Sequence, residues 1–188
     1  MIEDIEFETY LNISPNKFQI CLFDKTKLNN LYKDEFKFES NSENIDLNNL
    51  NKFLENNIFK IEKLIGKFIK NIFLIIESDR IYNINFIIKK KNYDKKIKRE
   101  NLENLLKEAK DLFNETYNDH KIMHMIINKY FINDIVHQRI DNIETADNLA
   151  VEIKFISFEG KEFLEIEKVL KSFQIEITSY LCCKYIKK

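Results

Sequence analysis

The three histidines of this chain are the residues whose type and spacing come nearest to a metal site. His120 and His124 are four residues apart, and Asp119, Asp134 or His137 could complete a donor set of the kind that zinc prefers. An i, i+4 pair can chelate one ion on a helix. The apolar segment around His124 predicts a strand instead, in which these positions are about 13 Å apart. We therefore favour structural roles for the histidines and expect no metal site.

The cysteines are an odd set of three, namely Cys21, Cys182 and Cys183. Adjacent cysteines rarely form a disulfide with each other, and this pair lacks the two-residue spacer of thioredoxin-like redox motifs. Because Cys182-Cys183 borders an apolar strand, we favour packing in the core. No signal peptide precedes Glu3-Asp4, so the sequence predicts a reduced, cytoplasmic location.

The strongest local charge feature is a run of cations that is broken only by Asn92, Tyr93, Asp94 and Ile97. Such runs are usually solvated loops at hairpin ends, and the alternative is an anionic partner or a phospholipid surface. The cations are Lys89, Lys90, Lys91, Lys95, Lys96, Lys98 and Arg99.

Carboxylate pairs that could act as acid and base fall on predicted surfaces, as with Glu3 and Asp4 or Glu165 and Glu167. No serine, histidine and aspartate can be placed in one site from the sequence. We therefore expect no catalytic residues and no enzyme activity.

The composition disfavours several classes of protein. Thirty basic and thirty-one acidic residues leave a net charge of -1, which disfavours a general nucleic-acid binder. A hydrophobic content of 44% excludes a disordered chain. The longest apolar run, 72–76, is far shorter than the roughly 20 residues that cross a bilayer. We expect the membrane to be reached only indirectly, through a partner.

The first part of the chain predicts a β-meander followed by a βαβ crossover. Apolar runs at 7–13 and 17–23 flank the turn residues Ser14-Pro15-Asn16, and a third run lies around 31–38. From 47 to 65 apolar residues recur at helical spacing, with Asp46 as a cap and Gly66 at the end. The run 72–76 reads as a strand buried on both faces.

The second part predicts a separate α+β sheet. Apolar and polar residues alternate over 82–88, a helix follows over about 102–113, and strands at 122–132 and 149–158 flank a short strand. A helix over 163–173 and a last strand over 175–182 complete the chain. We predict a first lobe over 1–79, an inserted subdomain over 80–174, and a return strand and tail over 175–188.

This second part resembles the insert of FtsA, the actin-like family of bacterial cell division. The segments that carry the resemblance are Met123-His124-Met125-Ile126 and Tyr130-Phe131-Ile132-Asn133-Asp134, which match a family run of Ile-His-Val-Ile-Pro followed by an aromatic, a β-branched pair and Asp-Gly. The similarity extends from about 10 to 180. It implies an α/β plus α+β fold, a partial actin-like (ribonuclease H-like) lobe with an inserted strand-helix-strand-strand subdomain.

The phosphate loop of that family is degenerate in this chain. Where the family reads Asp-Ile-Gly-Thr-Ser-Lys, this chain has Asn12, Ser14, Pro15, Asn16 and Lys17 at the matching positions, with Ile13 between the first two. A carboxylate, a permissive glycine and one backbone N–H are lost together. No glycine follows Gly160, so a second phosphate loop is not found either. The resemblance therefore implies no bound cofactor.

The resemblance implies a non-catalytic FtsA-like protein that acts through protein–protein contacts in bacterial cell division. Its expected partners are cell-division proteins and further copies of itself, with no nucleic acid. Its expected location is the cytoplasm, with recruitment to the inner face of the cell membrane at the division site. The alternatives are a pilus-assembly component similar to PilM, a nucleotide-binding dimer of half-lobes, and a divergent globular domain that matches by accident.

Overall fold

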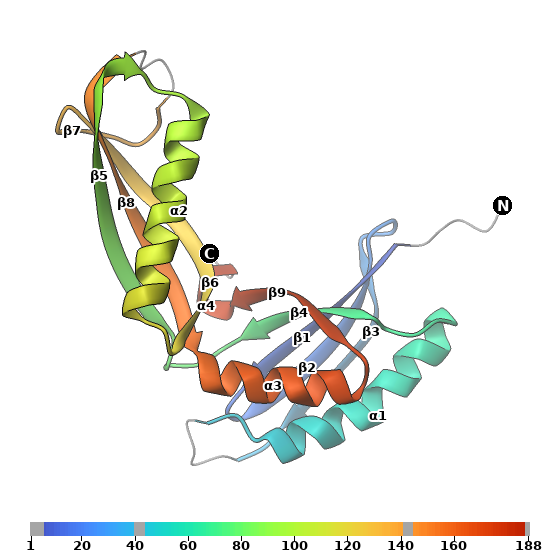
Figure 1. The fold of residues 1–188 in the computed structure, drawn as a ribbon. Helices are drawn as coiled ribbons and strands as arrows, with labels where there is room; N and C mark the ends of the chain where they lie inside the picture. The colour runs from blue at the N-terminus through green and yellow to red at the C-terminus, as the bar shows by residue number, and fades with distance from the viewer. Residues whose placement is uncertain (1–5, 40–43, 141–144, 187–188) are drawn as a thin grey trace. The chain divides into compact units, whose positions relative to one another are not determined.

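The chain folds into two units that are joined by two connections. The computed structural model describes residues 6–39, 44–140 and 145–186 (Figure 1). One unit, called the lobe here, comprises 1–81 and 160–188, and the other, called the insert, comprises 82–159.

The lobe is built on a five-stranded mixed sheet. An antiparallel meander of β1 (Phe7–Ser14), β2 (Lys17–Asp24) and β3 (Asn29–Lys37) forms one half. Strand β4 (Asn71–Ile76) then pairs parallel to β1, and β9 (Glu176–Cys182) pairs parallel to β4. The strand order is therefore β3-β2-β1-β4-β9, which confirms the predicted meander and crossover.

Helix α1 (Leu47–Ile65) supplies the crossover between β3 and β4, and its ends are where the sequence predicts them. Asp46 Oδ1 accepts the Asn49 N–H at 3.0 Å, and Gly66 ends the helix with a left-handed φ of 67°. One face of α1 is buried on the sheet, through Leu50, Phe53, Leu54, Asn57, Ile58 and Ile61.

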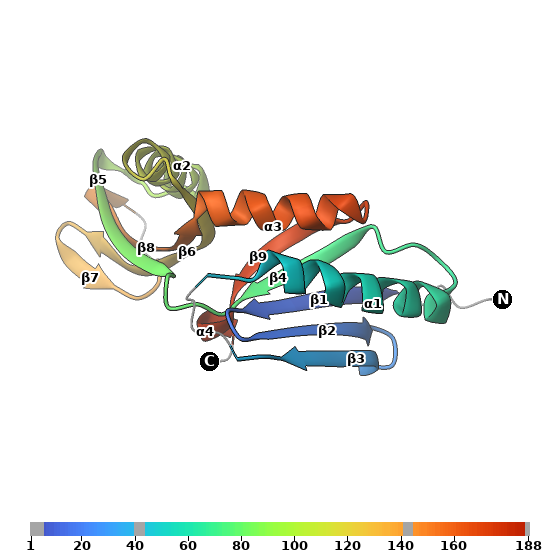
Figure 2. The ribbon, with the colours of Figure 1, turned by 90° about the horizontal axis from the view of Figure 1, so that it is seen from below.

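Helix α3 (Gly160–Ser172) belongs to the lobe, whereas the sequence placed it in an insert that ended at 174. It lies on the same face of the sheet as α1 (Figure 2) and buries Phe163, Ile166 and Leu170. The Phe163 ring meets Tyr180 of β9 edge-on at 4.6 Å. The apolar face of α3 thus packs in the lobe, and the insert therefore ends before α3. A short helix, α4 (Cys183–Ile186), follows β9.

The insert is a four-stranded antiparallel sheet with one helix. Its strands are β5 (Tyr82–Lys96), β6 (His120–Ile132), β7 (Ile135–His137) and β8 (Thr145–Glu159), in the order β5-β8-β6-β7. The cation run was predicted as a loop, but much of it lies on β5. The reason is that β8 is long enough to pair with Lys89, Lys90 and Lys91, and again with Lys95 and Lys96 beyond a bulge.

Helix α2 (Arg99–Thr116) covers one face of the insert sheet. Phe113 of α2 stacks on Phe155 of β8 with ring centroids 4.8 Å apart, and Phe86 of β5 meets Phe155 edge-on. Leu149, Val151 and Ile153 of β8 belong to the same core cluster. The alternation of apolar and polar residues along β8 therefore marks the two faces of the sheet, as predicted.

In the part of the chain that the structure describes, no helix is both long and apolar enough to cross a membrane.

Candidate functional site

The β1–β2 turn and the segment that follows β4 line a hollow of the lobe, a cleft of about 830 Å³. Because β1 and β4 run parallel, their carboxyl ends reach the same edge of the sheet, which is where open α/β sheets bind ligands. The cleft is lined by Ser14, Pro15, Asn16, Lys17, Lys37, Phe38, Glu39, Glu77, Ser78, Asp79 and Lys184.

The turn at this cleft is closed by its own polar groups. The Ser14 hydroxyl lies 3.0 Å from Asn16 Oδ1 and 3.1 Å from the Lys17 carbonyl oxygen. The Phe38 N–H donates to the Asn16 carbonyl at 3.1 Å, which ties the turn to the end of β3. A phosphate cradle needs successive N–H groups aimed at one point, and Pro15 supplies none. None of these turn residues has the positive φ of a left-handed nest.

Asn12 is separated from the other phosphate-loop positions. It lies one strand repeat, about 7 Å, further from the turn and lines a different, smaller hollow of about 160 Å³ with Tyr10, Cys21 and Lys33. Its Oδ1 is buried and has no hydrogen-bond partner among the described residues. The structure thus brings Ser14, Pro15, Asn16 and Lys17 together and leaves Asn12 outside the cleft.

Charges in the cleft are balanced and largely paired. Lys184 Nζ lies 2.6 Å from Asp79 Oδ1, and this hydrogen bond lowers the pKa of the Asp79 carboxyl. Lys37 pairs with Glu35 at 2.8 Å. Glu77 at the cleft wall accepts from the Cys183 thiol at 3.4 Å.

The histidines do not assemble a metal site. His120 and His124 both lie on β6, with a bulge between Ile122 and His124. Within 6–39, 44–140 and 145–186, no group of three or more His, Cys, Asp or Glu residues is arranged to hold a metal ion.

The structure does bring a serine, a histidine and an aspartate together, which sequence reasoning could not do. His120 Nδ1 lies 3.4 Å from Ser157 Oγ, and His120 Nε2 lies 3.8 Å from Asp119 Oδ1. Ser157 is on β8 and is fully buried, so its hydroxyl cannot reach a substrate. Tyr82 packs edge-on against His120 at 4.7 Å. Asp119 and Tyr82 are exposed, so the cluster lies at the surface of the insert and only its serine is fully buried.

The remaining candidates have structural contacts. Cys182 and Cys183 are both buried and are not joined in a disulfide. Burial raises the pKa of the Cys21 thiol, which donates to Asn30 Oδ1 at 2.9 Å. Glu167 accepts from the Tyr180 hydroxyl. Glu3 and Asp4 lie outside the described residues.

Comparison with known proteins finds similar folds but no similar sequences. No protein-family model matches this chain, and no curated protein sequence matches it significantly. Among solved structures, the PilM–PilN type IV pilus biogenesis complex aligns with 95% of this chain at a TM-score of 0.58 and 7% identity, and the alignment covers 48% of the matched chain. This chain has an actin-like fold. The agreement includes both the lobe and the insert, and it confirms the predicted fold class.

Two other actin-like structures align more loosely. The cytoplasmic domain of EpsL, an inner-membrane component of the type II secretion system of Vibrio cholerae, has a TM-score of 0.47 at 7% identity, over 94% of this chain and 57% of the other. A Bacteroides thetaiotaomicron protein of unknown function with an actin-like ATPase fold has a TM-score of 0.34 at 14% identity, over 96% and 55%. This chain spans about half the length of the structures that it matches. The FtsA resemblance is supported as an actin-like fold, and not as membership of FtsA.

Proposed function

We propose that this chain is a PilM-like component that works by protein–protein contacts in a pilus-biogenesis or secretion-type assembly. The observation that carries the proposal is the alignment of nearly the whole chain, lobe and insert together, with PilM in its complex with PilN. At 7% identity the likeness is one of fold. The assembly and the partner are therefore our inference.

A non-catalytic role fits the chemistry of the cleft. Pro15 removes an N–H donor, the Ser14 hydroxyl is bonded within the turn, and Asn12 lies outside the cleft. Asp79, the carboxylate at the end of β4, is paired with Lys184. These residues give no reason to assign a bound cofactor. We propose that the protein reaches the inner face of the membrane through its partner.

The test of the proposed partner is a defined binding experiment. The purified 188-residue chain would be titrated calorimetrically with a synthetic peptide that copies the cytoplasmic N-terminus of the PilN-like membrane protein from the same cell. Saturable binding that a scrambled peptide of the same composition does not reproduce supports the proposal. Absence of binding to that peptide, together with co-purification of division proteins from cells, would contradict it.

A cell-division role is the second candidate, and it rests on the insert motif. Asn133 and Asp134 form the β6–β7 turn with φ values of 50° and 65°, and they stand where the matching FtsA run reads Asp-Gly. A fluorescently tagged chain that gathers at the septum of dividing cells would favour this role. A distribution that follows the pilus or secretion machinery would favour the first.

Nucleotide binding by a dimer of half-lobes is tested separately, with ATP and Mg²⁺ as the probe. We expect no heat of binding. A binding heat that disappears in Lys17→Ala and persists in Lys27→Ala would show that the cleft binds a nucleotide and would overturn the proposal that no cofactor is bound. Lys17 lines the cleft, and Lys27 is an exposed lysine on the β2–β3 turn.

A further inference from the structure

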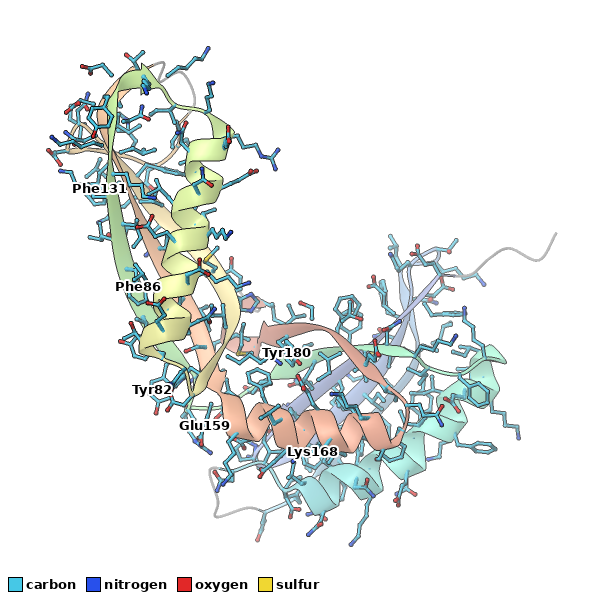
Figure 3. All side chains as sticks on the ribbon, in the orientation of Figure 1. Tyr82, Phe86, Phe131, Glu159, Lys168 and Tyr180 are labelled. Atoms are coloured by element: carbon cyan, nitrogen blue, oxygen red, sulfur yellow. The ribbon has the colours of Figure 1, made fainter. Side chains whose placement is uncertain are left out.

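The end of the insert that is remote from its chain connections gathers two exposed segments. The chain enters the insert at Tyr82 and leaves it at Glu159, and these residues share one end of the unit, while Phe131 lies toward the other (Figure 3). At that other end, Asn148 of β8 pairs with Lys91 on one side and accepts the Asn133 N–H at 3.0 Å on the other. We call 89–99 and 133–139 together the insert tip.

The tip concentrates positive charge. Three of its cations are paired, with Asp134, Glu108 and Glu103. The other five are exposed and form no ion pair with any described residue. These five are Lys91, Lys95, Lys96, Lys98 and Arg139. The local field therefore differs from that of the whole chain, whose net charge is -1.

A bulge in β5 places an aromatic residue between the lysines of this segment. The pairing with β8 is interrupted between Lys91 and Lys95, and Tyr93 and Asp94 both have left-handed φ values, 54° and 53°. Asn92 is buried below them, and its Nδ2 donates to the Lys95 and Ala146 carbonyls. Left-handed backbone costs about 1–3 kcal/mol at such residues, so the surroundings must enforce it. The result is a Tyr93 side chain that is 68% exposed.

Aliphatic side chains extend the exposed apolar surface of the tip. Ile135 and Val136, on the β6–β7 hairpin, are both exposed. Lys89 Nζ lies 2.6 Å from Asp134 Oδ1, so a side chain of β5 reaches the turn of this hairpin although β8 lies between the two strands. Tyr93 stands between Lys91 and Lys95 in the chain, and exposed tyrosine and aliphatic side chains in the same part of a surface as lysines are a combination that settles at a lipid headgroup layer. The ring sits at the interface, and lysine stems extend so that their ammonium groups meet anionic phosphates.

We propose that the insert tip docks on an anionic phospholipid surface. The exposed apolar side chains at the same end of the sheet as the cations argue for lipid over nucleic acid, because a phosphate backbone needs cations alone. The proposal is independent of the assembly proposed above, since it concerns only residues of the insert. It adds a direct membrane contact to the recruitment through a partner that is proposed above.

The test is co-sedimentation of the full chain with vesicles. We expect binding to phosphatidylcholine vesicles that contain about one third phosphatidylglycerol, little binding to pure phosphatidylcholine, and release near 1 M salt, where the Debye length is about 3 Å. The triple variant Lys91→Gln, Lys95→Gln, Lys96→Gln should bind about 100-fold more weakly, at roughly fivefold per lysine. The matched control neutralises Lys27, Lys52 and Lys60 of the lobe and should change binding little.

A second variant separates the apolar contribution. Tyr93→Asn removes the ring at a position where asparagine tolerates the left-handed backbone. The variant should therefore fold normally, which circular dichroism would verify. Binding should fall at least about threefold. Equal losses in the tip and control triple variants would overturn the proposal. So would binding to duplex DNA that is as tight as to the anionic vesicles at the same salt.

Discussion

Arg80 Nη1 donates to Glu162 Oε2 at 3.0 Å, and the two side chains are only 24% and 9% exposed. Arg80 lies just before β5 and Glu162 in the first turn of α3, so the pair joins the two lobe segments between which the insert is placed. Glu162 Oε1 also accepts the Ile45 N–H at 2.9 Å, close to the start of α1. One buried carboxylate thus fastens three segments of the lobe.

Removing the cation from this pair should destabilise the lobe. Arg80→Met leaves the Glu162 carboxylate nearly buried without its cation, and breaking such pairs costs about 3–5 kcal/mol. Because Arg80 is partly exposed, we expect a loss of about 2–3 kcal/mol in the free energy of unfolding, measured by urea denaturation with circular dichroism. Hydrogen exchange at the Ile45 amide should also accelerate.

The control is a pair with the same chemistry on the surface. Arg99 Nε lies 2.8 Å from Glu103 Oε1, four residues apart on α2, with side chains 92% and 59% exposed. Arg99→Met should cost less than about 1 kcal/mol. Similar losses for the two variants would show that burial of the Arg80–Glu162 pair has no special effect.

A polar contact between β3 and α1 gives a second prediction. The Tyr32 hydroxyl donates to Asn57 Oδ1 at 2.5 Å, while Asn57 Nδ2 donates to the Phe53 carbonyl at 2.8 Å. Asn57 is fully buried, so Tyr32→Phe leaves an acceptor unsatisfied and should cost about 1–3 kcal/mol in unfolding free energy. In Asn57→Leu the same tyrosine substitution should cost much less. Additive losses in this double-mutant cycle would mean that the two side chains are not coupled.

His124 gives a prediction about pH. Burial lowers its pKa from the ordinary 6.5, because the folded state disfavours the charged imidazolium. Below about pH 6.5 the unfolded chain then binds the proton more readily, so the free energy of unfolding should fall as the pH falls toward the folded-state pKa. His124→Gln should flatten this part of the stability profile. NMR titration of the ring should give a pKa below 6.5, and a raised pKa would contradict the structural role.

Local elements could be predicted because their signals are local. The cap at Asp46 and the stop at Gly66 mark the two ends of α1. The run 72–76 was predicted to be buried on both faces, whereas in β4 one face is buried and the other, with Phe73 and Ile75, is half-buried. The alternation along β8 marks its two faces. The cation run was misjudged because polar residues on an edge strand have loop-like composition, and the pairing with β8 cannot be read from it.

The chemistry of the β1–β2 turn can be read from the residue types alone, because Pro15 lacks an N–H in any fold. Which residues share a site depends on the packing of the elements. The tertiary structure placed Asn12 outside the cleft, buried Ser157 beside His120, gave α3 to the lobe, and assembled the insert tip from two segments. These outcomes depend on strand order and register between residues far apart in the chain, as with Arg80 and Glu162. Hydrophobic periodicity specifies which face of an element is buried, and it leaves open which other element covers that face.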